Sequence, residues 1–144
     1  YLSGVEGTIK GTIIHEVLRG RDAGVVCAEF GLNDSSIILQ CEEIAARFYS
    51  SELIKRVERS YCEVPFVISY EGRPVTGKID RLCLLEDGSW IVIEHKSEAS
   101  ADYIALAVEY QFSLLVYVEA ARQIMKGSAS GYFWFTETGE FFRI

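Results

Sequence analysis

The segment Gly77–Ser97 has the sequence GKIDRLCLLEDGSWIVIEHKS, and it decides the fold predicted for this chain. Two apolar runs flank the dipeptide Asp87-Gly88, which in this setting is a strong signal for a tight hairpin turn. We therefore predict two antiparallel β-strands joined at Glu86–Gly88, and the remaining elements are placed around this pair.

Charged residues occupy matching positions on the two predicted strands. Asp80 lies on the first strand, and the second ends in Glu94, His95 and Lys96, directly after the apolar run Trp90–Ile93. Side chains alternate along a strand, so Glu94 and Lys96 project to one side and His95 to the other. Antiparallel pairing can bring Asp80 alongside them. Uncompensated charges beside a buried strand are costly, so this cluster indicates a counter-ion.

A divalent metal ion is the counter-ion that suits this cluster. Mg²⁺ or Mn²⁺ takes hard oxygen ligands, and Mg²⁺ keeps several waters and shares its coordination shell with substrate phosphates. A bound ion of this kind activates water and stabilises charge on a phosphate under attack, while Lys96 can orient the water or stabilise the same charge. The alternative interpretation is an ordinary surface hairpin that carries charged residues.

The bulk properties predict one globular domain. The chain has 144 residues, 49% apolar and 12% aromatic, which is enough for a hydrophobic core and unlike a disordered chain. No signal peptide is visible, and no apolar run approaches the length of a bilayer span, so we expect a cytoplasmic protein without a membrane partner. The chain opens at Tyr1 without an initiator Met, so we expect a piece of a larger protein.

Cysteine spacing and net charge argue against two kinds of protein, a zinc or iron–sulfur protein and an autonomous DNA-binding protein. The four cysteines are widely separated, which argues against a zinc or iron–sulfur site and favours buried thiols in a reducing compartment. The net charge of −7 argues against an autonomous, tight DNA-binding protein, because contact with the phosphate backbone favours a basic surface. If the substrate is DNA, we expect another domain or subunit to provide most of the DNA binding.

The N-terminal segment predicts a helix from Glu6 or Thr8 to Leu18, ended by Gly20. His15 lies off the centre of the apolar stripe of this helix, and Gly11, one turn earlier on the same face, leaves room for a close approach. A partly exposed helix histidine without a role is the alternative to a metal ligand.

The rest of the chain predicts further helices and strands. Asp22 to about Ile54 has a helical pattern, and a short helix from Ser50 is expected to carry Lys55, Arg56 and Arg59 on a solvated face. Tyr61–Tyr70 is strand-like and turns at Glu71–Pro74 into the Asp80 strand. Ser100–Met125 predicts a long helix, apolar nearly all round and so buried on the sheet. A hairpin rich in aromatic residues closes the chain.

The arrangement of Asp80, then thirteen residues, then Glu94-x-Lys96 resembles the core of the PD-(D/E)XK nuclease superfamily. Within it, the chain is most similar to the C-terminal exonuclease domain of RecB/AddA-type members of the UvrD/Rep-family helicase–nucleases. Other motifs occur in that family's order. GTIIHEVL resembles the G-x-x-H-x-x-L helix with His15 as the ligand. Glu63-x-Pro-Phe resembles the entry strand, whose Glu lies near the metal as a secondary contact; the alternative is a simple edge-strand glutamate beside a proline. Tyr110 and Tyr117 match Y-x-x-Q-x-x-x-Y, but Ser113 stands at the Gln position.

The resemblance implies an α/β fold with a restriction-endonuclease-like core, in which helices flank a mixed central β-sheet. It implies that residues 1–144 form one nuclease domain of a larger helicase–nuclease, acting on DNA with Mg²⁺ or Mn²⁺. The implied metal ligands meet at one site: His15, Asp80, Glu94 and the main-chain carbonyl of His95. The implied catalytic residues are Asp80, Glu94, Lys96, Glu63 and Tyr117.

Two other functions stay open from the sequence. One is a catalytically inactive nuclease-fold domain with a structural or DNA-guiding role, which the Ser113 departure and the acidic charge favour. The other is a free-standing nuclease for RNA, repair or phage recombination.

Overall fold

The central element of the structure is a mixed five-stranded β-sheet with the strand order β1-β2-β3-β4-β5. This is a computed structural model that describes all 144 residues. The β1–β2, β2–β3 and β4–β5 pairs are antiparallel, and β3 and β4 are parallel. The strands span Val57–Tyr70 (β1), Arg73–Leu85 (β2), Trp90–Lys96 (β3), Ala129–Phe135 (β4) and Glu140–Arg143 (β5). The predicted α/β class with a mixed sheet is confirmed.

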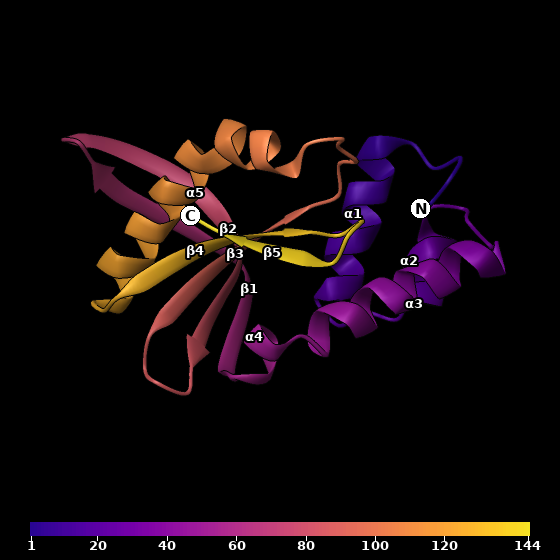
Figure 1. Cartoon of the computed structure of the whole chain (residues 1–144), viewed down its shortest axis with the longest axis horizontal. Coiled ribbons are helices and arrows are strands. Elements are labelled where there is room, and N and C mark those ends of the chain that lie inside the picture. Colours follow the sequence, from indigo (N-terminus) through magenta and orange to yellow (C-terminus); the bar gives the residue numbers. More distant parts are fainter.

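Helices cover both faces of the sheet (Figure 1). The helices α1, α2 and α3 pack on one face and α5 packs on the other, so the sheet separates two hydrophobic cores. The short helix α4 leads into β1. The helices span Gly7–Leu18 (α1), Ala23–Glu29 (α2), Ser35–Tyr49 (α3), Glu52–Lys55 (α4) and Tyr103–Met125 (α5).

The starts of three helices follow from local chemistry. The carboxylates of Asp22, Asp34 and Asp102 accept backbone N–H bonds in the first turns of α2, α3 and α5. An aspartate N-cap satisfies donors that the helix itself leaves free, which is why the chain turns helical at these positions.

The β2–β3 hairpin forms as predicted, and its register decides which charges meet. Arg81 pairs with Ile93 and Leu84 with Trp90, which sets Asp80 opposite Glu94 at the open end of the hairpin. Alternation then sends Leu82 into the core beneath α5 and Cys83 into the core beneath α1–α3. The end of β3 therefore collects the acidic residues where the two helical layers meet the sheet.

Two boundaries differ from the prediction at the first strand. β1 begins at Val57 and not at Tyr61, so Arg59 lies on a strand. The prediction that one short helix carries Lys55, Arg56 and Arg59 is therefore wrong. The long-range ladder is the reason, because Arg59 pairs with Leu84 across the sheet. The turn into β2 contains only Glu71-Gly72, so the predicted four-residue turn is two residues too long.

The longest helix is also shorter and more exposed than predicted. α5 begins at Tyr103, not Ser100, and its outer face exposes a row of apolar side chains that includes Phe112, 63% exposed. The predicted packing of this helix against the sheet is confirmed, but only the face that carries Leu114 meets the sheet. By length and composition α5 is apolar enough to cross a bilayer, contrary to expectation, but here it is a core helix packed on the sheet.

Candidate metal centre

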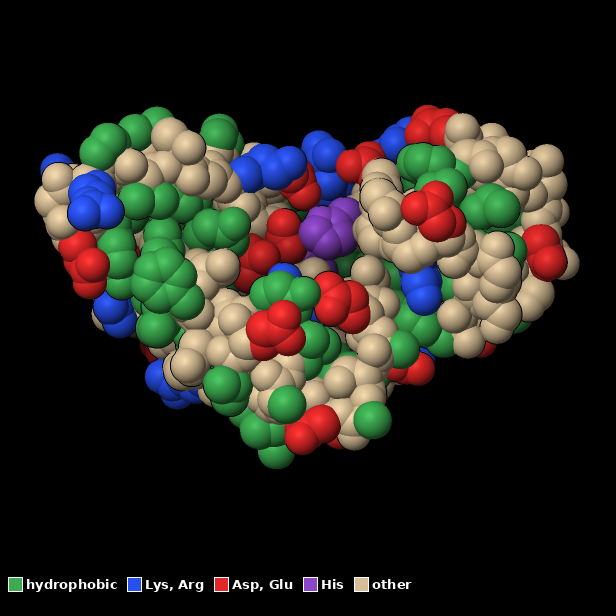
Figure 2. All heavy atoms as spheres, turned by 90° about the horizontal axis from the view of Figure 1, so that it is seen from above, with side chains coloured by type: hydrophobic (Ala, Val, Ile, Leu, Met, Phe, Trp, Pro, Cys, Tyr) green, Lys and Arg blue, Asp and Glu red, His purple; other side chains and the backbone are tan.

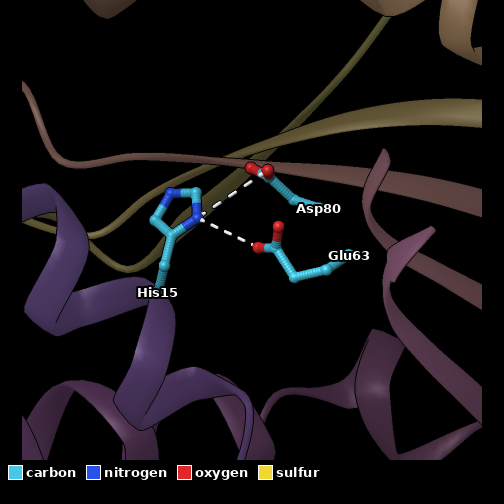
Figure 3. A group of neighbouring side chains, drawn as sticks. All are labelled: His15, Glu63 and Asp80. Carbon is cyan, nitrogen blue, oxygen red and sulfur yellow. Dashed lines mark ion pairs between the residues drawn. The ribbon is translucent and has the colours of Figure 1, made fainter. Parts of the chain in front are cut away.

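Three side chains from three different elements converge in a notch beside the sheet (Figure 3). His15 comes from α1, Glu63 from β1 and Asp80 from β2. His15 Nδ1 lies 3.7 Å from Glu63 Oε1 and 3.7 Å from Asp80 Oδ1. One donor atom from each of the three lies within 4.8 Å of the others.

The geometry and chemistry of this triad fit a divalent metal ion. Two ligands that sit about 2.1 Å from one Mg²⁺ lie at most about 4.2 Å apart, so the 3.7 Å separations allow a shared ion. Asp80 Oδ2 accepts the His95 backbone N–H at 3.1 Å, which leaves Oδ1 directed at His15. One imidazole and carboxylate oxygens are a donor set suited to Mg²⁺ or Mn²⁺.

Glu94 lies directly beside the triad without belonging to it. Its Oε1 accepts the Asp80 backbone N–H at 3.5 Å, as their opposed places in the β2–β3 hairpin predict. Burial, and then the negative charge of Asp80, raise the pKa of Glu94 to about 8, and the Lys96 ammonium opposes this rise. Burial also raises the pKa of Asp80, although His15 acts against it. The two half-buried carboxyls cannot both ionise easily without a cation, so the site favours binding one.

Lys96 extends from the same strand end and is held by an aromatic ring. Its Nζ lies 3.8 Å from the centroid of the Tyr110 ring on α5, within the range of a cation–π contact. The Tyr110 hydroxyl donates to Glu98 Oε1 at 3.0 Å, which fixes the ring in place. The amine therefore has a defined position next to Glu94.

Tyr117 also approaches the acidic pair from α5. Its ring packs edge-on against Phe66 at 5.4 Å between centroids and lies over Gly77, where an added Cβ would come within 3.2 Å of it. Burial, followed by the charges of Glu94 and Asp80, raises the pKa of Tyr117. The phenol therefore keeps its proton near neutral pH and can act as a hydrogen-bond donor.

His95 contacts the site with its backbone N–H and with its ring, which packs edge-on against His15 at 5.7 Å between ring centroids. The imidazole is 6% exposed and packs against Phe48 at 5.1 Å between ring centroids, inside the core beneath α1–α3. Burial, together with His15 and Arg81, lowers the pKa of His95, so the ring is neutral. The main-chain carbonyl of His95 is a predicted ligand, and the backbone N–H of the same residue donates to Asp80 Oδ2.

Glu63 has a more central position than its sequence motif indicated. The resemblance gave it a secondary contact, but it lies as near to His15 as Asp80 does. Its backbone φ of +55° lies in the left-handed region, which non-glycine residues adopt at a cost of roughly 1–3 kcal/mol and mainly where function requires it. Its carboxylate also forms an ion pair with Lys78, a residue that the sequence analysis missed. The one sequence signal for Lys78 near the site was its spacing, because it lies two residues before Asp80 and therefore on the same side of β2.

His15, Glu63 and Asp80 line an open, polar cleft between two lobes of the molecule (Figure 2). The cleft has a volume of about 450 Å³ and no hydrophobic side chain in its lining, and Arg19 and Lys78 supply its positive charge. Gly11 on α1 allows the end of β3 to approach, because a Cβ there would lie 3.2 Å from Ser97 Oγ. The close approach predicted at Gly11 is therefore observed.

The basic residues expected on a solvated face, and Ser113, lie away from the site. Lys55 pairs with Glu52 and Arg56 with Glu86, and neither lines the cleft. Ser113, at the position where the resembled family carries Gln, is exposed on α5.

Comparison with known proteins identifies the family. The family model of the PD-(D/E)XK nuclease superfamily matches residues 6–141. A solved structure from Eubacterium rectale named "Putative exonuclease" has a TM-score of 0.66 and 16% identity, and the match covers 100% of this chain and 61% of that one. This chain thus spans under two thirds of the length of that protein, and at this identity the likeness concerns the fold. No curated protein matches the chain. Since the family match runs from the start of α1 into β5, this chain belongs to the PD-(D/E)XK nuclease superfamily.

Proposed function

We propose that this chain is a metal-dependent DNA exonuclease domain that hydrolyses phosphodiester bonds, with Mg²⁺ or Mn²⁺ as its cofactor. The observation that carries the proposal is the convergence of His15, Glu63 and Asp80 with Glu94 beside them in an open polar cleft. A cluster of buried carboxyls next to an amine is a costly arrangement that a bound cation relieves.

Each side chain has a role that follows from its place. His15, Asp80 and Glu94, with Glu63 and the His95 carbonyl, would hold the ion, which when bound would lower the pKa of a water and stabilise charge on the phosphate. Lys96 would orient the attacking water or stabilise the pentavalent phosphate. Tyr117, as a protonated phenol, would donate a hydrogen bond at the acidic pair. Arg19 and Lys78 would contact phosphates beside the scissile one.

The wider role follows from the same resemblance and from charge. We place the domain in DNA end processing and recombinational repair in the cytoplasm, joined to a helicase domain or subunit of RecB/AddA type. The net charge of −7 supports a motor that delivers the strand, because the domain has little basic surface of its own. Cleavage of linear but not circular DNA, once the helicase partner is present, is the result expected of an exonuclease.

The central experiment compares cleavage of end-labelled DNA by purified wild type, Asp80→Asn and Lys96→Ala. With Mg²⁺ or Mn²⁺ the wild type should cut and both variants should lose at least 100-fold in rate, while Lys55→Ala, outside the cleft, should keep wild-type activity. Wild-type rates in either Asp80→Asn or Lys96→Ala would refute the assignment.

The second candidate is a catalytically inactive nuclease-fold domain that guides DNA or holds partners together. The exposed Ser113 at the Gln position favours it, because this helix then lacks one polar group that supports the site in the resembled family. Calorimetric titration with Mn²⁺ separates the two candidates when it is paired with the cleavage assay. DNA binding without metal binding or cleavage would support the inactive scaffold.

A further inference from the structure

We propose that Arg81 is a positioning residue that sets the spacing of the metal-binding side chains. It does so by tying together the three elements that carry His15, Glu63 and Asp80. The inference rests on the proposed metal site.

The Arg81 guanidinium is buried, 4% exposed, on the face of β2 opposite Asp80. It donates to Ser60 Oγ of β1 at 2.8 Å and to the main-chain oxygen of Leu18 at the end of α1. It also donates to the Tyr49 hydroxyl of α3 at 3.3 Å. One planar group therefore bonds to three separate elements.

No carboxylate neutralises this buried cation. Its charge faces the rings of Phe48 and Tyr49, at 5.0 and 5.6 Å from their centroids, and the negative end of the α1 dipole at Leu18. Tyr49 also donates to the Leu18 carbonyl, so α1 and α3 are held at the same point. The buried Nε has no hydrogen-bond partner, so the bonds of the two terminal nitrogens and the ring contacts hold the guanidinium in place.

Each of these bonds lies close in sequence to a candidate ligand. Leu18 is three residues after His15, Ser60 three residues before Glu63, and Arg81 itself follows Asp80. A shift of α1 or β1 relative to β2 would change the 3.7 Å distances from His15 to both carboxylates. The bonds to Leu18 and Ser60 oppose such shifts. A lysine could not reproduce them, because an ammonium lacks the planar fork of donors.

The first test measures Mn²⁺ affinity by calorimetry in wild type, Arg81→Met and Leu114→Ala, at a temperature where all three are folded. Met keeps length and apolar bulk without leaving a charge unpaired. Arg81→Met should weaken Mn²⁺ binding about 10- to 100-fold, the range seen when groups that support metal ligands are removed. Cleavage at saturating Mn²⁺ should return to within a few-fold of wild type. Leu114→Ala, in the other core, should lose stability but keep Mn²⁺ affinity.

The second test needs no metal. The chain has only two histidines, so NMR of the ring ¹³C–¹H groups gives two signals to assign. Arg81→Met should shift or broaden the His15 signal, and Leu114→Ala should leave it unchanged. If Arg81→Met fails to fold, Tyr49→Phe and Ser60→Ala each remove one bond partner and should weaken Mn²⁺ binding by smaller factors.

The outcomes distinguish this inference from the proposed function. Wild-type Mn²⁺ affinity and an unchanged His15 signal in Arg81→Met, or in both single-bond variants, would overturn the positioning role and leave the nuclease proposal standing. Failure of the wild type itself to bind Mn²⁺ would overturn the proposed metal site, and with it the basis for this role.

Discussion

Replacing Glu94 with Gln should stabilise the metal-free protein at high pH and leave its stability unchanged at low pH. Glu94 is buried beside Asp80, and these two causes raise its pKa to about 8. The folded protein therefore holds a proton on Glu94 at pH values where the unfolded chain, with a pKa near 4.5, has released it. Gln resembles the protonated carboxyl in shape and cannot ionise.

The sign and size of the effect follow from this difference. The folded state binds more protons than the unfolded state between pH 4.5 and about 8, so the free energy of unfolding falls as pH rises through this window and levels off above it. At about 1.4 kcal/mol per unit of pKa, the loss by pH 9 is on the order of 5 kcal/mol. Glu94→Gln does not lose this stability, so at pH 9 its free energy of unfolding should exceed that of wild type by up to roughly the same amount.

The assay is urea unfolding in the presence of a chelator at several pH values from 5 to 9. Glu109→Gln, an exposed carboxyl on α5, is the matched control and should follow wild type at every pH. Mn²⁺ at about 100 times its Kd should reduce the difference at pH 9 by about half, because it adds roughly 2.7 kcal/mol to a protein that binds it. If wild type and Glu94→Gln change equally with pH, burial of the Glu94 carboxyl does not govern the metal-free site.

Three further substitutions test other parts of the site. Tyr110→Leu removes the ring that holds Lys96, so kcat for cleavage should fall about 10-fold while the Mn²⁺ affinity measured by calorimetry stays unchanged. Equal losses of kcat and of Mn²⁺ affinity would contradict this role. Gly77→Ala places a Cβ 2.6 Å from Phe66 Cζ, so the free energy of unfolding measured with urea should fall by about 1–3 kcal/mol. The control Gly72→Ser, in the exposed turn, meets no neighbouring atom and changes only a residue with positive φ. Glu63→Gly relieves the positive φ, so the melting temperature should hold while Mn²⁺ affinity falls; unchanged affinity would remove this residue from the proposed ligand set.

Local sequence signals were sufficient for the elements that carry the site. The Asp87-Gly88 turn and the apolar runs around it predicted the β2–β3 hairpin, and the register of that hairpin sets Asp80 opposite Glu94. Helical periodicity and Gly20 likewise predicted the end of α1 at Leu18, with His15 partly exposed. These predictions succeed because turn chemistry and side-chain periodicity act between residues that are near neighbours in the chain.

Only the tertiary structure decided which distant groups meet. The place of Glu63 depends on a positive φ within β1, and the bonds of Arg81 join residues up to 63 positions apart, so no local pattern encodes either. The same holds for the exposed face of α5, because an apolar helix does not specify which of its sides the sheet will cover. By itself, then, the sequence determined the hairpin, the main helices and the acidic residues at the strand end. Long-range packing of α1 and β1 against β2 decided the shape of the metal centre, since contacts between distant segments depend on the whole fold.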